Sequence, residues 1–122
     1  MEHLKTKHVL VTGGAGFIGS NIIEALLKAG VRTTCLDNFA TGKPENIRPF
    51  KAYSHFTMIE GDIRDIDTCM KACEDTDIVC HQAALGSVPR SINDPKTSTD
   101  VNIGGFVNML VAAKDTNIKR FV

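Results

Sequence analysis

The sequence has no excess of either charge. Lysine and arginine together number 14, and aspartate and glutamate also number 14. The basic residues form no block or stripe along the chain, although a protein that binds a phosphate backbone needs a basic patch. Nucleic acid is therefore not an expected partner.

Long apolar runs are also missing. The chain begins with residues 1–5, Met-Glu-His-Leu-Lys, which lack the apolar centre of a signal peptide. No run approaches the ~18–20 apolar residues that a membrane span requires. We expect a cytoplasmic protein without a membrane partner.

No two cysteines have the C-x-x-C spacing. Cys69 and Cys73 lie four apart on a predicted helix, while Cys35 and Cys80 fall in predicted strands. These are ordinary positions for reduced, buried thiols. Cys80 precedes His81, but neighbouring strand residues point to opposite faces, and no second ligand pair has zinc spacing. We expect no metal site.

Internal repeats and low-complexity tracts are absent, so 122 residues with 43% apolar content indicate one globular domain with a core. Strand-like and helix-like segments alternate, which predicts an α/β fold with a doubly wound parallel sheet between two layers of helices. Strands are expected at 8–12, 31–37, 55–60 and 77–81, with a fifth beginning at 119–122; helices are expected at 16–29, 66–74 and 97–117, and a long loop with a short helix near 45–48 at 38–54.

A glycine-rich stretch joins the first predicted strand to the first predicted helix. Gly14, Gly16 and Gly19 satisfy G-x-G-x-x-G, and Gly13, Gly16 and Gly19 satisfy T-G-x-x-G-x-x-G. In dinucleotide-binding folds these glycines make a tight turn, let backbone approach a pyrophosphate, and let helix and strand pack closely. Unpaired amides at the helix start then attract the phosphate charge. The stretch predicts a Rossmann-type dinucleotide site, with a connector of no function as the alternative.

Asp37 ends the second predicted strand, eighteen positions after Gly19. This is close to the ~20-residue interval expected for the carboxylate that binds the adenosine ribose. A carboxylate accepts hydrogen bonds from both ribose hydroxyls and repels a 2′-phosphate, which predicts NAD rather than NADP. The alternative is a turn-forming aspartate ahead of Asn38. Residues 41–43 are either near the ribose or solvated turn residues.

Two further strand ends carry candidate residues. Asp62 follows the third predicted strand, at the edge where ligands bind in open α/β sheets, and is a candidate for the adenine amino group. Asp65 is expected to cap the next helix. The fourth strand opens into residues 81–91 at the expected switch point of the sheet. His81 is expected to be a strand-end residue with a satisfied ring rather than a catalytic base.

Within residues 81–91, small residues would let a flat ring lie against the backbone, although tight packing explains them equally well. Arg90 is either a binding residue or a surface charge. In the helix predicted at 97–117, Asn102, Gly104 and Gly105 are unfavourable. They indicate close packing, a buried polar contact or an irregular helix, and Asn102 is the candidate for a structural or cofactor-facing hydrogen bond.

These stretches resemble the extended short-chain dehydrogenase/reductase family, its NAD-dependent epimerases and dehydratases, and most of all the UDP-hexose 4-epimerases that act on N-acetylated sugars. The resemblance covers the whole chain and is carried by residues 12–19, 37–42, 61–64 and 81–91. It implies a bound NAD that takes a hydride from a UDP-sugar substrate and returns it to the other face of the keto sugar, while a tyrosine accepts the hydroxyl proton.

Carried over by position, the resemblance implies backbone contacts of the pyrophosphate with Phe17 and Ile18, and ordering by Asn102 of the wall near the nicotinamide. The full set of implied cofactor residues is Gly13, Gly16, Phe17, Ile18, Gly19, Asp37, Asn38, Asp62, Ile63, Ala83, Ala84 and Asn102. The implied sugar-side residues are Gly86, Ser87 and Ser91.

The chain departs from the family pattern in its catalytic residues. The family's Ser/Thr, Tyr-x-x-x-Lys and sugar-binding domain would lie beyond Val122, and the single tyrosine, Tyr53, has Thr57 rather than lysine four positions on. We expect residues 1–122 to be the N-terminal part of an NAD-binding domain, inactive alone, from a protein that dimerises through the helix at 97–117. A nucleotide-sugar dehydratase or decarboxylase, and a non-catalytic dinucleotide-binding module, remain as alternatives.

Overall fold

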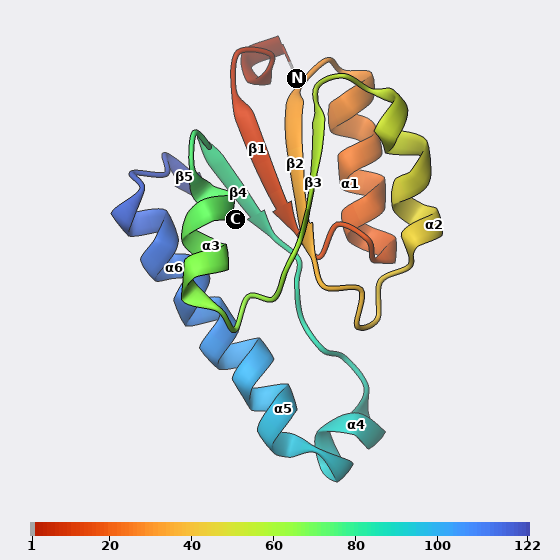
Figure 1. The fold of residues 1–122 in the computed structure, drawn as a ribbon, viewed down its shortest axis with the longest axis vertical. Helices are drawn as coiled ribbons and strands as arrows, with labels where there is room; N and C mark the ends of the chain where they lie inside the picture. The colour runs from red at the N-terminus through yellow and green to blue at the C-terminus, as the bar shows by residue number, and fades with distance from the viewer. Residues whose placement is uncertain (1) are drawn as a thin grey trace.

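Five parallel strands form one sheet in the computed structural model, which describes residues 2–122 (Figure 1). The strand order is β3-β2-β1-β4-β5, so the first strand is central and the chain reverses its direction across the sheet after β3. The four predicted strands and the beginning of a fifth are confirmed. Their bounds are β1 His8–Thr12, β2 Arg32–Asp37, β3 Phe56–Glu60, β4 Ile78–His81 and β5 Arg120–Phe121.

Helices cover both faces of the sheet, which gives the predicted three-layer α/β fold (Figure 1). On one face lie α1 (Phe17–Lys28), α2 (Pro44–Ile47) and the 3-10 turn η2 (Arg48–Ala52). On the other face lie α3 (Ile66–Cys73) and α6 (Phe106–Asp115). A short 3-10 turn, η1 (Glu2–Leu4), precedes β1.

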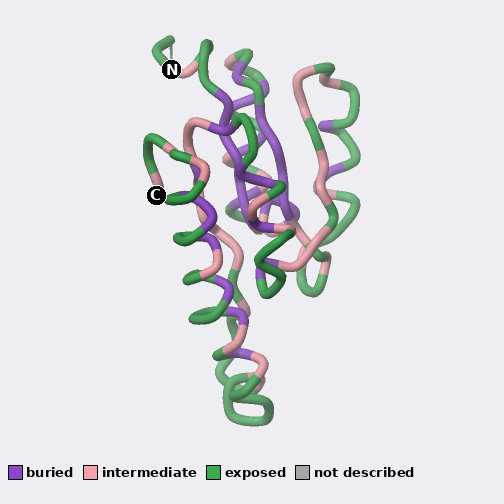
Figure 2. The backbone as a smooth tube through the Cα atoms, turned by 60° about the vertical axis from the view of Figure 1, so that its left-hand side comes forward, coloured by how far each residue is buried: buried purple, intermediate pink, exposed green. Residues whose placement is uncertain are grey.

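The strand β1 is buried along its whole length, as Figure 2 shows for the centre of the molecule. Because side chains alternate along a strand, Val9 and Val11 enter the core beneath α1, whereas Leu10 enters the core beneath α3 and α6. Residues Ile23, Leu27 and Ile47 fill the first core, and Leu36, Val79 and Met109 fill the second. Burial on both faces explains the continuous apolar run that first identified this strand.

The last helical region differs from the regular helix predicted at 97–117. It consists of α5 (Pro95–Thr99), a π-helical segment η3 (Asp100–Gly105) and α6, so the alternative of an irregular helix is confirmed. Close packing also occurs at Gly105, because a Cβ there would lie 2.5 Å from the Ile63 side chain. A π-helical segment widens the helix locally, as is frequent near functional sites.

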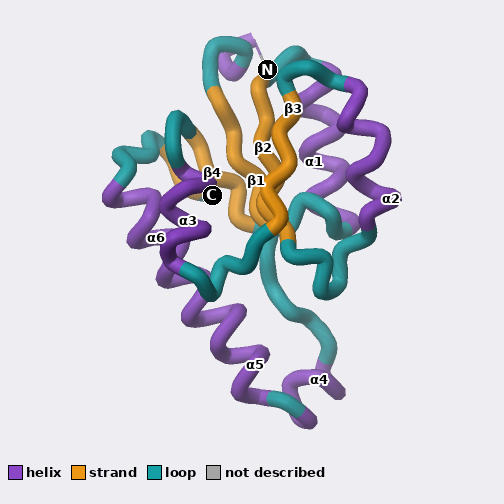
Figure 3. The backbone as a smooth tube through the Cα atoms, in the orientation of Figure 1, coloured by secondary structure: helices purple, strands orange, loops and turns teal. Residues whose placement is uncertain are grey.

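One helix was missed. Residues 81–91 were expected to form a loop, but α4 occupies Val88–Asn93. Its start is capped by Ser87, which accepts a hydrogen bond from the Arg90 amide at 3.4 Å, and Pro89 lies in its first turn, where its missing N–H costs little. Helices α4 and α5 extend past the carboxyl edge of the sheet (Figure 3).

Among the described residues, no helix combines the length and apolarity needed to cross a bilayer. Those residues also contain no cluster of three or more histidine, cysteine or acidic side chains around a point where a metal ion could sit.

His8 links the beginning of β1 to β2 and to the segment that precedes β4. Its ring contacts the Thr34 hydroxyl through Nε2 at 2.6 Å and the Asp75 carbonyl through Nδ1 at 2.8 Å, and its amide donates to Asp77 Oδ2 at 2.9 Å. Burial lowers the pKa of His8, assisted by the charge of Arg32, against the opposing effect of the Asp75 carbonyl. The folded protein therefore favours the neutral ring.

We expect the free energy of unfolding to decrease as the pH falls from 7.5 to 5.5. A lowered pKa in the folded state means that the unfolded chain binds more protons once the pH approaches its ordinary pKa of about 6.5, so stability is lost on acidification. Urea unfolding at several pH values checks this, with His8→Gln expected to flatten the dependence. An unaltered slope in the His8 variant would contradict the assignment.

Candidate functional site

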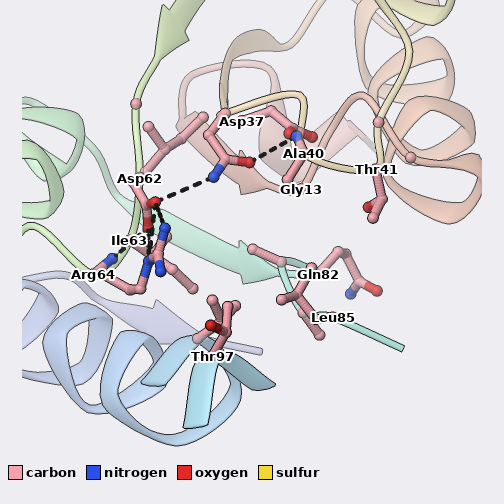
Figure 4. A pocket seen from close by; sticks show the side chains of 18 residues that line it. Gly13, Asp37, Ala40, Thr41, Asp62, Ile63, Arg64, Gln82, Leu85 and Thr97 are labelled. Atoms are coloured by element: carbon pink, nitrogen blue, oxygen red, sulfur yellow. Dashed lines mark hydrogen bonds and ion pairs between the residues drawn. The ribbon is translucent and has the colours of Figure 1, made fainter. Parts of the chain in front are cut away.

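A cleft of about 190 Å³ opens at the carboxyl edge of β1, β2 and β4 (Figure 4). It lies between the turn after β1 and the segments that follow β2, β3 and β4. This is the switch point of the sheet, where connections from neighbouring strands diverge and ligands bind in open α/β folds. Eight of the twelve predicted cofactor residues line it: Gly13, Gly16, Asp37, Asn38, Asp62, Ile63, Ala83 and Ala84.

The turn after β1 is built by close backbone contacts. Gly13 has a φ of +69°, and a Cβ on it would lie 2.7 Å from the Ala83 amide nitrogen. Gly19 of α1 packs directly on the backbone of Gly13 and Gly14, with no room for a side chain. Gly13 thus makes the turn, and Gly19 lets the helix pack on it, as predicted for the first and last glycines of the motif.

The N-terminus of α1 has no side-chain cap among the described residues. Its N-cap residue is Gly16, and Phe17 and Ile18 are 83% and 62% exposed. By contrast, the predicted cap of α3 is confirmed, since Asp65 accepts a hydrogen bond from the Asp67 amide at 3.1 Å. The first amides of α1 therefore remain available to an anion. The side chains of Phe17 and Ile18 do not line the cleft, and the contact predicted for these two residues involves their backbone alone.

Asp37 holds the glycine turn in place. Its Oδ2 accepts a hydrogen bond from the Ala15 amide at 2.9 Å, and its Oδ1 accepts one from the Phe39 amide at 2.8 Å. The turn-forming role considered for Asp37 is therefore real. A carboxylate has about four acceptor sites, so two such bonds leave capacity for two ribose hydroxyls.

The loop after β2 is hydrogen-bonded to the glycine turn. These contacts were not predicted from the sequence. The carbonyl of Ala15 accepts hydrogen bonds from the Lys43 amide at 3.1 Å and from Asn46 Nδ2 at 2.8 Å. A Cβ on Gly42 would lie 2.7 Å from the Ala15 side chain. Thr41 and Gly42 line the cleft. Lys43 contacts the glycine turn through its backbone amide, and its side chain is exposed to solvent.

The carboxylate of Asp62 also lines the cleft, near Asp37, and is paired with an arginine that was not predicted (Figure 4). Arg64 contacts it through Nη2 at 2.6 Å and through Nε at 3.0 and 3.1 Å. Hydrogen bonding by Arg64 holds the pKa of Asp62 below its ordinary value. Asn38 Nδ2 reaches the same carboxylate at 3.2 Å, which brings two predicted cofactor residues together.

The neighbouring residue Ile63 is buried and fixes this segment to the second core. Its carbonyl accepts a hydrogen bond from Asn108 Nδ2 at 2.9 Å, and its side chain packs on Gly105. The irregular helical region thus supports the cleft wall that carries Asp62.

Thr12, the last residue of β1, makes a set of bonds to the end of β4 that the sequence did not reveal. The buried hydroxyl accepts from the amides of Gln82 at 3.0 Å and Ala83 at 3.1 Å, and lies 2.8 Å from His81 Nδ1. The His81 ring packs near Phe106, and burial lowers its pKa. His81 is therefore a strand-end residue, as predicted, and its ring is paired through Nδ1.

Asn102 orders the segment after β4. Its Oδ1 accepts from the Leu85 amide at 2.7 Å and its Nδ2 donates to the Leu85 carbonyl at 2.9 Å. Its side chain lies outside the cleft lining, so its role in this structure is the structural one of the two considered.

The predicted sugar-side residues Gly86, Ser87 and Ser91 are exposed and do not line the cleft. Ser91 donates to the Val88 carbonyl at 2.8 Å, and Arg90 donates to the Gly86 carbonyl at 2.7 Å. Their polar groups are used within α4 and the turn before it. Arg90 therefore stabilises its own turn.

A glycine turn leading into an uncapped helix at the switch point of a doubly wound parallel sheet defines a Rossmann-type dinucleotide-binding fold. Residues 9–122 match the model of the NAD dependent epimerase/dehydratase family, and the chain belongs to this family.

Named relatives agree with this assignment. UDP-glucose 4-epimerase of Mycolicibacterium smegmatis is 36% identical over 93% of this chain and 36% of its own length. Two solved structures are 40% identical to this chain. UDP-glucose 4-epimerase of Thermus thermophilus, complexed with NAD, matches over 93% of this chain and 36% of its own length, with a TM-score of 0.83. UDP-N-acetylglucosamine 4-epimerase of Methanobrevibacter ruminantium, complexed with UDP-N-acetylmuramic acid, matches over 94% of this chain and 36% of its own length, with a TM-score of 0.86.

The family includes other chemistry as well. UDP-glucuronic acid decarboxylase 1 of Danio rerio is 32% identical over 88% of this chain and 25% of its own length. The chain spans about a third of the length of the epimerases it matches.

We expect Gly13→Ala to lower the free energy of unfolding by at least ~2 kcal/mol. The added Cβ forces a non-glycine residue to a positive φ, which costs roughly 1–2 kcal/mol, and it also collides with the backbone at Ala83. Urea unfolding followed by circular dichroism measures the change.

The matched control is Gly104→Ala in the π-helical segment, where a Cβ meets open space. It is expected to be neutral or to stabilise by up to about 1 kcal/mol, because alanine loses less backbone entropy than glycine. Equal losses in the two variants would refute the argument from close approach.

Proposed function

We propose that this chain is the NAD-binding part of a UDP-sugar 4-epimerase that interconverts UDP-N-acetylglucosamine and UDP-N-acetylgalactosamine, or UDP-glucose and UDP-galactose. One observation carries the proposal: the uncapped start of α1 follows the glycine turn that lines the cleft, and the carboxylates of Asp37 and Asp62 line the same cleft. These groups match, in order, a pyrophosphate, a ribose and an adenine. Bound NAD would supply reversible hydride acceptance.

Each group of the chain then has a defined task. The backbone of Gly13, Gly16, Phe17 and Ile18 receives the pyrophosphate, and Asp37 with Asn38 receives the adenosine ribose. Ala83 and Ala84 provide a flat wall near the nicotinamide, held by the Thr12 hydroxyl through the Ala83 amide. Asn102 keeps the next residue of that wall, Leu85, in place. Gly86, Ser87 and Ser91 would face the sugar only when the remainder of a longer protein covers α4.

The proton-transferring tyrosine of such an epimerase is not available in this chain. Tyr53 is the single tyrosine, and it packs against the core beneath α1, with its ring 5.4 Å from that of His55, rather than in the cleft. We therefore propose epimerisation for a longer protein and no turnover by residues 1–122. Two solved epimerases are 40% identical to this chain, whereas a dTDP-glucose 4,6-dehydratase is 33% and the decarboxylase 32% identical, which favours the epimerase over the dehydratase and decarboxylase alternatives.

We further propose a cytoplasmic location and a role in nucleotide-sugar metabolism. The four cysteines are free, and Cys35, Cys69 and Cys73 are buried, which suits a reducing compartment.

Calorimetric titration with NAD and NADP tests the cofactor assignment. NAD is expected to bind at least ~10-fold more tightly than NADP, because a 2′-phosphate beside the Asp37 carboxylate is repelled. Asp37→Asn keeps the size of the side chain and removes its charge. It should weaken the binding of NAD and reduce the ratio of the affinities for NAD and NADP.

The control for this titration is Asp115→Ala, which removes an exposed carboxylate on α6 away from the cleft and should leave both affinities unchanged. Tighter binding of NADP than of NAD by the unsubstituted chain would contradict the assignment of Asp37 to the adenosine ribose. Thermal unfolding of each variant shows whether its turn remains folded.

We also propose that the full-length protein is a homodimer. A row of apolar side chains is exposed on η3 and α6: Ile103, Phe106, Val107, Leu110 and Val111. Their exposures run from 40% to 61%, and contiguous apolar surface of this kind marks an interaction site.

Self-association through this row predicts a concentration-dependent mass in light scattering. Leu110→Glu should shift the population to the monomer, whereas Val88→Glu, which changes an exposed apolar residue on α4, should not. A monomer at all concentrations for the unsubstituted chain would count against the dimer.

A further inference from the structure

The carboxylate of Asp62 is saturated with donors. Four N–H groups reach it: the Arg64 amide at 2.9 Å, Arg64 Nε at 3.0 and 3.1 Å, Arg64 Nη2 at 2.6 Å and Asn38 Nδ2 at 3.2 Å. A carboxylate has about four acceptor sites. No acceptor site therefore remains for the amino group of a purine.

Asp37 provides an internal comparison. It also lies in the cleft, but within residues 2–122 its two oxygens receive only the amides of Ala15 and Phe39. One carboxylate of the cleft is thus open to a ligand, whereas the other is closed by a side chain of the same cleft wall (Figure 4).

We propose that Arg64 is a latch on the adenine end of the cleft, whose guanidinium competes with the purine amino group for Asp62 and must move before the nucleotide is fully bound. This inference rests on the proposed function, because it takes the occupant of the cleft to be an adenine dinucleotide. It assigns Arg64 a specificity-determining role: only a base that donates a hydrogen bond at position 6 compensates for the broken ion pair.

Two features allow the guanidinium to move without disturbing Asp62. The pair is partly solvated, with side-chain exposures of 44% for Arg64 and 29% for Asp62, so the displaced guanidinium can be hydrated. The Arg64 amide and Asn38 still hold the carboxylate after the guanidinium leaves. The latch thus opens by a side-chain rotation alone.

The sign of the effect separates this role from ordinary charge attraction. Removing a cation near the cleft should weaken the binding of an anionic dinucleotide. Removing a competing guanidinium should instead strengthen it, by about the two- to five-fold that corresponds to a partly exposed ion pair. Tighter binding after loss of a positive charge is therefore the expected signature.

The experiment compares the unsubstituted chain, Arg64→Met and Arg64→Lys by calorimetric titration with NAD and with nicotinamide hypoxanthine dinucleotide, in which a carbonyl oxygen replaces the amino group. Arg64→Met, which keeps the apolar stem, should bind NAD about two- to five-fold more tightly, with no gain for the hypoxanthine analogue. Arg64→Lys should give an intermediate affinity, because an ammonium lacks the bidentate fork.

The matched control is Lys96→Met. It removes a cation that is paired with Asp100 rather than with Asp62 and that precedes the cleft residue Thr97 in the chain. Lys96→Met should bind each dinucleotide as tightly as the unsubstituted chain does, or slightly more weakly. A second readout is the side-chain Nε–H resonance of Arg64 in nitrogen NMR, which should move towards that of a solvated guanidinium when NAD is added and stay unchanged when the hypoxanthine analogue is added.

Weaker binding of NAD by Arg64→Met would overturn the latch, because Arg64 would then contact the nucleotide directly. Equal tightening for both dinucleotides would also overturn it, because the competition would not concern the amino group. If neither the unsubstituted chain nor Arg64→Met binds NAD, the proposed function fails together with the latch; NAD binding without tightening in the variant defeats the latch alone.

Discussion

The hydrogen bonds of the Ala15 backbone are the constraint on which the cleft depends. The Ala15 amide donates to Asp37, and its carbonyl accepts from the Lys43 amide and from Asn46. Ala15 is fully buried, so leaving these groups unpaired would be costly. The glycine turn is therefore held from the side by the β2–α2 connection.

Much of the fold could be predicted because its signals are local. A strand buried on both faces reads as a continuous apolar run, as at residues 9–11, and a glycine turn between strand and helix occupies a single stretch of sequence. The carboxyl ends of parallel strands share one edge of the sheet, so Asp37, Asp62 and Ala83 could be brought to one cleft from strand positions alone. The π-helical segment was foreseen only as an alternative, from the unfavourable residues in the helix.

The missed features depend on partners far apart in the chain. Thr12 was read only as the end of a strand, because its bond to the Ala83 amide joins residues 71 positions apart. Asn46 reaches Ala15 across 31 positions. Arg64 is only two positions from Asp62, yet a side chain that folds back on its neighbour leaves no periodic signal. Helix α4 was missed because its Ser87 cap and Pro89 were read as features of a loop.

The two carboxylates of the cleft show how one edge of a sheet can hold two kinds of polar group. Asp37 uses about half of its acceptor sites for the turn that it supports. The same two hydrogen bonds fix the position of the carboxylate and the direction of its remaining lone pairs. Asp62 is held by Arg64 and Asn38, and its wall is anchored through Ile63 to the π-helical segment and α6. The Asp37 end of the cleft is consequently preorganised, whereas in the proposed binding mode the Asp62 end exchanges an internal ion pair for a ligand. Any account of affinity at this site must therefore treat its two ends separately.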